Sequence, residues 1–322
     1  MFYSMFGAFE SGVIYAIMAL GVYLSFRILD FPDLTVDGSF VTGAAVVGIS
    51  IINGVPTIIA TLLAALAGFL AGSITGILNT KGKINPLLSG IIMMIALYSI
   101  NLRIMGQPNL SIFNESTVFS QFEAWWGPIG IDQMLNELIQ SIGIERVPGT
   151  WSLLFIMIIV TIVIKLLSDY FLKTEVGLAL RATGDNEKMI RSFSANTDNL
   201  KIIGLGISNG LVALAGAFFA QYGGFADVGM GIGMIIIGLA SVIIGEALVG
   251  TKTIARTTLA VVCGAIIYRI AVTLALKIKF LEAGDMKLIT AILVIAALVT
   301  PKIISSRKEK LKKQRKRAAL SS

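Results

Sequence analysis

The chain has 322 residues, of which 56% are hydrophobic and only 14% are charged, with a net charge of +7. Soluble domains carry about 25% charged residues, so a folded globule of this composition would lack the polar surface that water requires. The composition indicates an integral membrane protein and excludes a secreted disulfide scaffold, a disordered chain and most soluble enzymes. The only cysteine, Cys263, cannot form an internal disulfide, and without histidine there is no imidazole metal ligand or histidine base.

Apolar segments of roughly 20 residues, the length that crosses the hydrocarbon core of a bilayer, recur along the whole chain. They predict an all-α integral membrane protein, a polytopic helical bundle of about nine spans within a range of eight to ten. The second segment begins with polar residues, so a continuous helix and a broken or re-entrant one both remain open. The expected spans are Ser11–Phe26, Leu34–Ile52, Thr57–Leu78, Pro86–Met105, Trp151–Ser168, Ile202–Tyr222, Gly231–Val249, Thr257–Leu276 and Met286–Thr300.

Lysine and arginine are distributed unequally between the connections on the two sides of the membrane. Positively charged connections stay in the cytoplasm, so the N-terminus is expected outside and the C-terminus in the cytoplasm. The chain divides into a membrane domain, 1–301, and a basic tail, 302–322, which holds nine of the 26 lysines and arginines. A basic tail directly after an apolar segment indicates contact with anionic lipid rather than with nucleic acid. The other cytoplasmic charges are Arg27, Lys81, Lys83, Lys173, Arg181, Lys188, Arg191, Lys201, Lys252 and Arg256.

The external connection, 106–150, is much longer than a simple turn and carries five acidic residues against one arginine. Together with Trp151, its pair Trp125 and Trp126 is typical of an aromatic belt at the level of the lipid headgroups. Apolar residues at helical spacing predict a helix over 132–144 that lies on the membrane or on the protein. A solvated loop and a docking site for a soluble partner both fit this segment.

The cytoplasmic connection, 172–201, predicts a compact knob. Thr174 is expected to cap a first short helix, with Glu175 in its first turn and Gly184 ending it. A second short helix is expected over Asn186–Phe193. Because a turn between spans needs only a few residues, about thirty ordered ones indicate a functional role.

No arrangement of residues indicates an enzyme active site. The segment Gly245–Thr253, GEALVGTKT, approaches a phosphate-binding loop, but Thr251 separates Gly250 from the lysine that must follow it directly. Paired carboxylates and an activated serine do not stand out either. We therefore expect a chain without catalytic residues, metal or cofactor of its own.

Glycines inside the apolar segments indicate close packing. Gly68, Gly72 and Gly76 share one helix face, where they allow two helices to approach closely. The glycine-rich stretch 223–233 is tolerated at membrane depth only where protein or a water-filled cavity covers it. We therefore expect this stretch to be enclosed or to border a cavity.

Charged and amide side chains near the spans are the candidates for a substrate path, since a charge at mid-bilayer costs at least ~2.5–3.5 kcal/mol. Asp33 and Asp37 are four residues apart and would share one face of a helix. Asn101 and Arg103 lie near the outer end of the fourth expected span. Opposite charges of this kind would suit the two ends of an amino acid. Alternatively, the aspartates mark a helix start and pair with Arg27, and Arg103 extends outward to water.

Two parts of the sequence carry a recognisable pattern. The spacing T-x-x-G-x-x-x-R-A-x-G, followed later by Asn, and the stretch NGLVALAGAFFAQYGG resemble ABC-transporter permeases of the branched-chain amino acid and ribose type. In that family Gly and Ile precede the asparagine, whereas Ser194 and Ala195 precede it here. The segments FRILDFPDLTVDGSFVTGAA and KINPLLSGIIMMIALYSINLRIMGQPN look like permeases of tryptophan/tyrosine-type ABC uptake systems. The residues that match the first pattern are Gly177, Arg181, Ala182, Gly184 and Asn196.

The resemblance implies a homodimeric importer permease in a bacterial cell membrane. Its partners would be two cytoplasmic ABC ATPase subunits, which bind the ATP and Mg²⁺, and an external substrate-binding lipoprotein received by the external connection. The knob would sit in a cleft of the ATPase through Glu175, Gly177, Arg181, Gly184 and Asn186. In this arrangement Arg181 would pair with an acidic or carbonyl group and Gly184 would set the turn. The transported solute would be small. An amino acid is the first candidate, and an aromatic amino acid is the first candidate within that class.

Two other functions remain open at this stage. An ion-coupled secondary transporter would need a buried relay of carboxylates or histidines and inverted repeats, and this sequence offers no histidine and few carboxylates within spans. A non-transporting membrane scaffold or receptor subunit would need neither a glycine-lined path nor the knob. The sequence does not specify the solute, so peptides and nucleosides also remain open.

Overall fold

The computed structural model describes residues 2–141, 143, 147–192 and 196–276, with isolated positions between 288 and 299. The ninth expected span lies outside the described residues apart from those positions, and the basic tail lies outside them entirely. The described helices are α1 (Phe2–Val22), α2 (Thr35–Ile52), α3 (Thr57–Thr80), α4 (Pro86–Met105), α5 (Val118–Trp126), α6 (Ile131–Ser141), α7 (Ser152–Lys173), α8 (Glu175–Ser192), α9 (Thr197–Gly223), α10 (Met234–Val249) and α11 (Ile254–Ala275).

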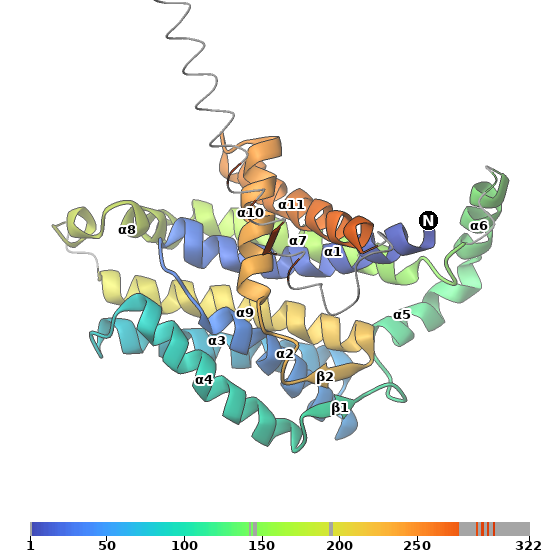
Figure 1. The fold of residues 1–322 in the computed structure, drawn as a ribbon, viewed down its shortest axis with the longest axis horizontal. Helices are drawn as coiled ribbons and strands as arrows, with labels where there is room; N and C mark the ends of the chain where they lie inside the picture. The colour runs from blue at the N-terminus through green and yellow to red at the C-terminus, as the bar shows by residue number, and fades with distance from the viewer. Residues whose placement is uncertain are drawn as a thin grey trace, which may run out of the picture.

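Within this part of the chain, seven helices are long and apolar enough to cross a membrane: α1, α2, α3, α4, α7, α9 and α11. They correspond to seven of the expected spans. The expected span Gly231–Val249 is shorter than predicted, because α10 begins only at Met234 and has 16 residues, fewer than the roughly 20 that a straight crossing needs. In Figure 1, α10 runs across the direction shared by α1 and α9.

The beginning of the chain differs from the prediction in two ways. α1 starts at Phe2 instead of Ser11, and it continues beyond Val22 as a π-helix over Tyr23–Ile28. The second expected span is one unbroken helix, α2. Because α2 begins at Thr35, Asp33 lies in the non-helical segment before it and does not share a helix face with Asp37.

The core of the bundle is formed by α1, α2 and α9, which are buried along most of their length. α3, α4 and α7 lie outside them and turn rows of large apolar side chains outward, such as Leu62 and Leu66 on α3 and Ile159 and Leu166 on α7. Lipid tails are as apolar as these side chains, so such exposed faces suit a bilayer.

Glycines bring α2, α3 and α9 into close contact. A Cβ atom at Gly43 of α2 would clash with the backbone of Ala213 on α9. On α3, Gly68, Gly72 and Gly76 all face α9, where a Cβ atom at each would again clash. The predicted packing face of α3 is thus confirmed.

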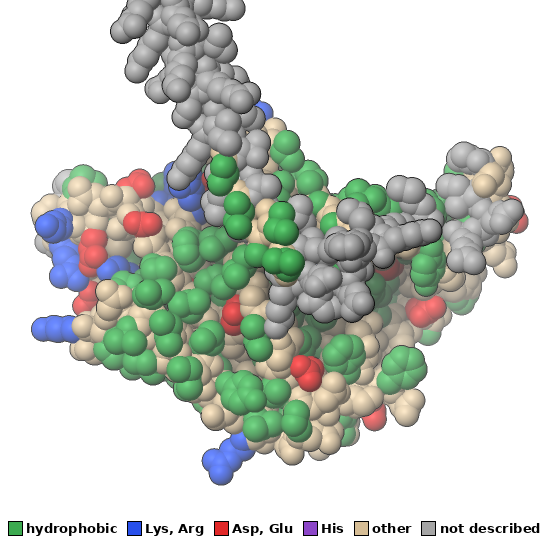
Figure 2. Space-filling model, viewed as in Figure 1, with side chains coloured by type: hydrophobic (Ala, Val, Ile, Leu, Met, Phe, Trp, Pro, Cys, Tyr) green, Lys and Arg blue, Asp and Glu red, His purple; other side chains and the backbone are tan. Residues whose placement is uncertain are grey.

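The two ends of the bundle are unlike. At the end that we call the knob end, α8 projects beyond the spans (Figure 1), and Lys and Arg side chains gather over it in Figure 2. At the opposite end, which we call the cap end, β1 (Asn109–Ser111) pairs antiparallel with β2 (Phe225–Asp227). The predicted helix over 132–144 is present as α6, Ile131–Ser141, and the helix α5 before it was not predicted.

Two of the three tryptophans hold the cap end together. Trp126 donates from Nε1 to Asp132 at 2.8 Å, and Trp151 donates from Nε1 to Asn136 at 3.0 Å. Trp125 remains exposed. α6 buries none of its residues completely, so it is held mainly by these hydrogen bonds.

We predict that Gly43→Ala destabilises the protein, because the added methyl group forces α2 away from α9. Overpacking of this kind costs about 1–3 kcal/mol, and we expect the unfolding midpoint of the purified chain in detergent to fall by several degrees. Gly127→Ala is the control, since a Cβ atom there meets no atom within 4 Å. Equal unfolding midpoints for the two variants would show that the α2–α9 contact does not limit the stability of the protein.

Candidate functional site

A cavity of about 740 Å³ lies between α2, α4 and the turn that leads into α10. Its size falls within the range of small-molecule sites. Most of its lining is apolar, and its polar members are few. Those polar side chains are Asp37, Tyr98, Ser99 and Asn101.

Asp37 fixes the start of α10 at the edge of this cavity. Its two carboxylate oxygens accept from the backbone N–H groups of Gly233, at 2.9 Å, and Ile235, at 2.8 Å. The first N–H groups of a helix have no partner within the helix, and a carboxylate there also interacts favourably with the helix dipole. The turn before α10 packs on the Asp37 backbone at Gly231. The glycine-rich stretch therefore borders a cavity, as predicted.

Asn101 joins α4 to α2 at the same cavity. Its side-chain nitrogen donates to the carbonyl of Gly38 at 3.1 Å, and its oxygen accepts from Thr42 Oγ1 at 2.9 Å. With both ends of the amide satisfied, the side chain is held in one orientation. Asp37 and Asn101 are thus brought to one site, as a substrate path would require.

Asp33 belongs to a buried network next to the cavity rather than to its lining. One oxygen accepts from the backbone N–H of Thr35 at 2.9 Å, and the other accepts from Asn209 Nδ2 at 2.6 Å. Asn209 in turn accepts from Ser39 Oγ at 2.7 Å. Because a buried carboxylate must be hydrogen-bonded, this network joins the start of α2 to α9. The three partners are ordinary polar residues of apolar segments, so their spacing gave no signal in the sequence.

Arg103 is not brought together with the aspartates. It lies exposed in the last turn of α4 and does not line the cavity. Arg27 pairs with Glu246 at 3.0 Å and not with either aspartate. The opposite charges that the sequence offered for the two ends of an amino acid therefore do not meet in this structure.

A second cavity, of about 650 Å³, continues along α10 toward the knob end. Ile236 lines both cavities. Among the described residues, the lining of the second is mainly apolar, and its charged members are Arg27, Asp30 and Glu246. We call the two cavities together the α10 groove. Tyr98 and the apolar members of this groove were not predicted, since no pattern distinguishes them from lipid-facing residues.

The knob, α8, bends once. Asn186 has a non-helical backbone, and its side chain accepts from the N–H of Met189 at 3.1 Å, so it ends one helical stretch and caps the next. Thr174 caps the start of α8 by accepting from the N–H of Gly177, as predicted. The prediction that Gly184 ends the first helix and sets the turn is wrong. Gly184 remains helical, and its missing side chain lets α8 pack on the carbonyl of Ile28.

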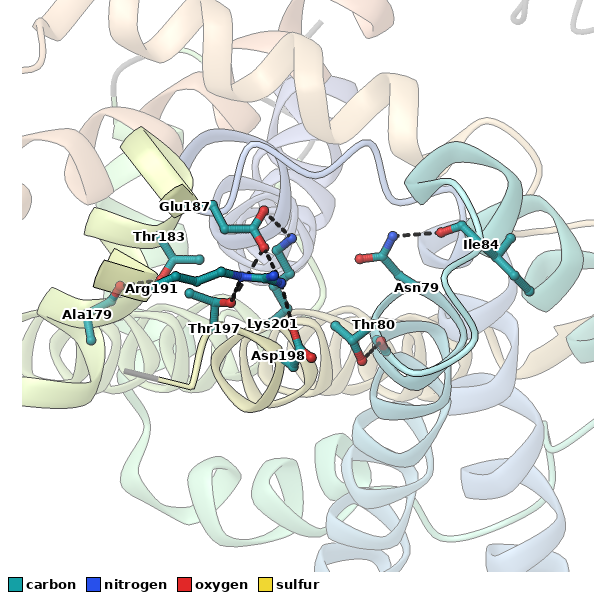
Figure 3. A network of polar contacts seen from close by, with 11 residues as sticks. Asn79, Thr80, Ile84, Ala179, Thr183, Glu187, Arg191, Thr197, Asp198 and Lys201 are labelled. Atoms are coloured by element: carbon teal, nitrogen blue, oxygen red, sulfur yellow. Dashed lines mark hydrogen bonds and ion pairs between the residues drawn. The ribbon is translucent and has the colours of Figure 1, made fainter. Parts of the chain in front are cut away.

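Ion pairs tie the second half of the knob to α9 (Figure 3). Glu187 accepts from Lys201 at 2.7 Å and from Arg191 at 3.0 Å, and Arg191 also pairs with Asp198 at 3.0 Å. Burial would raise the pKa of Glu187, but the hydrogen bond and charge of Lys201 and the charge of Arg191 outweigh it. The pKa is therefore lowered from its ordinary value of 4.5.

The remaining predicted knob residues differ in their surroundings. Glu175 and Asn186 are exposed, and Gly177 is buried against the end of α7 at Phe171. Arg181 lines a polar cavity of about 450 Å³ together with Asp185, and among the described residues it forms no ion pair. The knob also exposes large apolar side chains, namely Val176, Leu178 and Met189.

We predict that the knob loosens in acid. Since the pKa of Glu187 is lower in the folded state, its ion pairs stabilise the knob above the unfolded pKa, and this stabilisation is lost as the pH falls through the folded pKa. Hydrogen exchange of the second half of α8, corrected for intrinsic rates, should rise between pH 7 and about 3. Glu187→Gln should exchange fast already at pH 7, whereas Glu175→Gln, on the same helix, should follow the wild type. If the exchange of Glu187→Gln still depends on pH as in the wild type, the pH dependence comes from other groups.

Comparison with known proteins places the chain in a family. The family described as branched-chain amino acid transport system / permease component matches residues 4–298. A tyrosine transport system permease protein of Clostridioides difficile is 42% identical over 288 residues, 89% of this chain and 88% of the relative. An uncharacterized protein of Rickettsia prowazekii is 34% identical over 299 residues, 92% of this chain and 96% of the relative.

A shorter similarity links the chain to another transporter. The autoinducer 2 import system permease protein of Salmonella typhi is 34% identical over 86 residues, 26% of this chain and 25% of the relative. No solved structure matches the chain significantly. The match across nearly the whole length, together with the apolar helices, shows that the chain belongs to the family of branched-chain amino acid transport system permease components and is a multi-pass protein of a bacterial cell membrane.

Proposed function

We propose that the chain is the permease subunit of an ABC importer that moves an amino acid inward, with aromatic amino acids the first to test. The relative named for tyrosine transport, which matches along almost the whole chain, carries this proposal. Such a permease has ATPase and substrate-binding partners. Transport of the solute would be driven by ATP hydrolysis in the ATPase, and this chain would need no cofactor.

The knob end is the face that we assign to the cytoplasm and to the ATPase. Its lysines and arginines agree with the positive-inside rule. A projecting helix that is capped, bent once and tied to α9 by ion pairs is rigid enough to transmit a movement. Its exposed apolar side chains, Val176, Leu178 and Met189, would pack in the cleft of the ATPase.

The α10 groove is the passage that we assign to the solute. A second copy of the chain would complete its walls in a homodimer. Asp37 and Asn101 would contact the solute, while Asp33 would hold α2 in place behind them. Mainly apolar walls with a few fixed polar groups suit an amino acid with a large apolar side chain.

The cap end would receive the substrate-binding protein outside the cell. α6 stands at the far end of the molecule in Figure 1, and it exposes Met134 and Leu138. Exposed apolar residues on a helix beyond the spans suit a protein contact. This assignment places the N-terminus outside, as the charge distribution predicts.

We predict that Arg181→Glu weakens ATPase binding, because it reverses a charge at the base of the knob. After extraction in mild detergent, the wild type should retain an ATPase and the variant should lose most of it while remaining folded by size-exclusion chromatography. Arg103→Glu is the matched control, since the same charge reversal lies at the cap end and should leave the ATPase bound.

Two outcomes would contradict this prediction. If the ATPase stays with Arg181→Glu, the complex exists but Arg181 is not a contact. If no ATPase accompanies the wild type even after cross-linking, the ABC importer is the wrong class, and an ion-coupled transporter becomes the better hypothesis.

We predict that Asp37→Asn reduces uptake of labelled L-tyrosine by roughly ten-fold or more, because an amide cannot accept both N–H groups at the start of α10. Uptake in cells that express the complete importer would be compared with Asp227→Asn. Asp227 also accepts from a backbone N–H, that of Gly229 at 2.8 Å, but it does not line the groove. If uptake by Asp37→Asn is unchanged while the complex is intact, Asp37 has no role in the passage.

A further inference from the structure

One ion pair separates the α10 groove from the knob. Arg27 Nε lies 3.0 Å from Glu246 Oε1 and joins the π-helix after α1 to the last turns of α10. Both residues line the second cavity of the groove, and both also line the polar cavity that contains Arg181 of the knob. The pair is therefore part of the wall between the passage and the element that would contact the ATPase.

The segment that carries Arg27 is in direct contact with the knob. Gly184 of α8 packs on the carbonyl of Ile28, so closely that a Cβ atom there would clash. A displacement of α8 must therefore displace the end of the π-helix. π-Helices are rare, and they often lie at functional sites.

Glu246 lies near one end of α10, and the other end is held by Asp37. The two charged contacts thus fix α10 at both of its ends, one beside the solute cavity and one beside the knob. α10 lines the groove along its length. Release of either contact would free α10 to tilt and would change the width of the groove.

The pair is placed to break and form again. The Arg27 side chain is 61% exposed and that of Glu246 is 17% exposed, and ion pairs with such exposure contribute little to stability. The same two cavities hold alternative partners for both charges. Asp30 and Asp185 are available to Arg27, and Arg181 and Lys252 are available to Glu246.

We infer that the Arg27–Glu246 pair is a latch that keeps the knob end of the groove narrow, by holding α10 to the π-helix, and lets it widen when the knob moves. The two side chains act as positioning residues, since they hold α10 rather than the solute. This inference rests on the proposed transport function, but its test needs neither the solute nor the ATPase.

The test measures access to the groove from the knob end. In the full-length chain, Cys263→Ala removes the only natural cysteine, and Ile236→Cys places a reporter where the two cavities of the groove meet. Inverted membrane vesicles would be treated with a membrane-impermeant maleimide, and the labelling rate would be compared among the intact pair, Arg27→Glu, Glu246→Arg and the double swap. Lys81→Glu is the control, because Lys81 is exposed and lines neither cavity.

We expect each single variant to raise the labelling rate about three- to five-fold, as loss of one exposed ion pair allows, and the double swap to restore it. If either single variant fails to accumulate, Arg27→Gln and Glu246→Gln remove the attraction without adding repulsion. Unchanged labelling in the single variants, or no restoration by the swap, would overturn the latch. Retention of the ATPase would be measured on the same membranes, so its absence from the wild type would count against the proposed function and not against the latch.

Discussion

Every polar group buried in this bundle must find its partner within the protein, because the surrounding lipid offers none. The requirement is most severe where the chain leaves the helical conformation, between β2 and α10. Asp37 meets it by accepting from two N–H groups at the start of α10. The carboxylate can do so only if α2 lies beside that turn, so the position of α2 is set by this contact.

Two further contacts hold α2 in place. The glycine contact at Gly43 brings it against α9, and the network of Asp33, Asn209 and Ser39 fixes its beginning. A buried carboxylate with one donor on each oxygen is costly to disturb, since loss of either donor leaves a buried polar atom without a hydrogen bond. The polar groups near the groove thus stabilise the positions of the helices. The groove is the space that remains between these helices.

α10 differs from the other long apolar helices in length, direction and attachment. It is too short for a straight crossing, it runs across α1 and α9, and charged contacts hold it near both ends. The glycines at its beginning and the π-helix at its far contact are the least regular parts of the backbone in this region. An element that is clamped at two points and flanked by irregular backbone is suited to move as a unit, whereas α9 is locked by close packing on α3.

The sequence by itself determined the class of protein, since composition and the repeat of apolar segments leave only a helical membrane bundle. The matching glycine face of α3, the cap at Thr174 and the bend of the knob near Asn186 also followed from local rules. The tertiary structure alone decided which polar residues meet. Asp33 and Asp37 were expected on one helix face, yet one is a buried partner of Asn209 and the other caps α10. Arg27 pairs across 219 positions with Glu246. Gly184, expected to end a helix, instead provides room for Ile28. Sequence spacing reports neighbours along one helix, whereas these contacts arise between helices whose relative placement depends on the packing of the whole bundle.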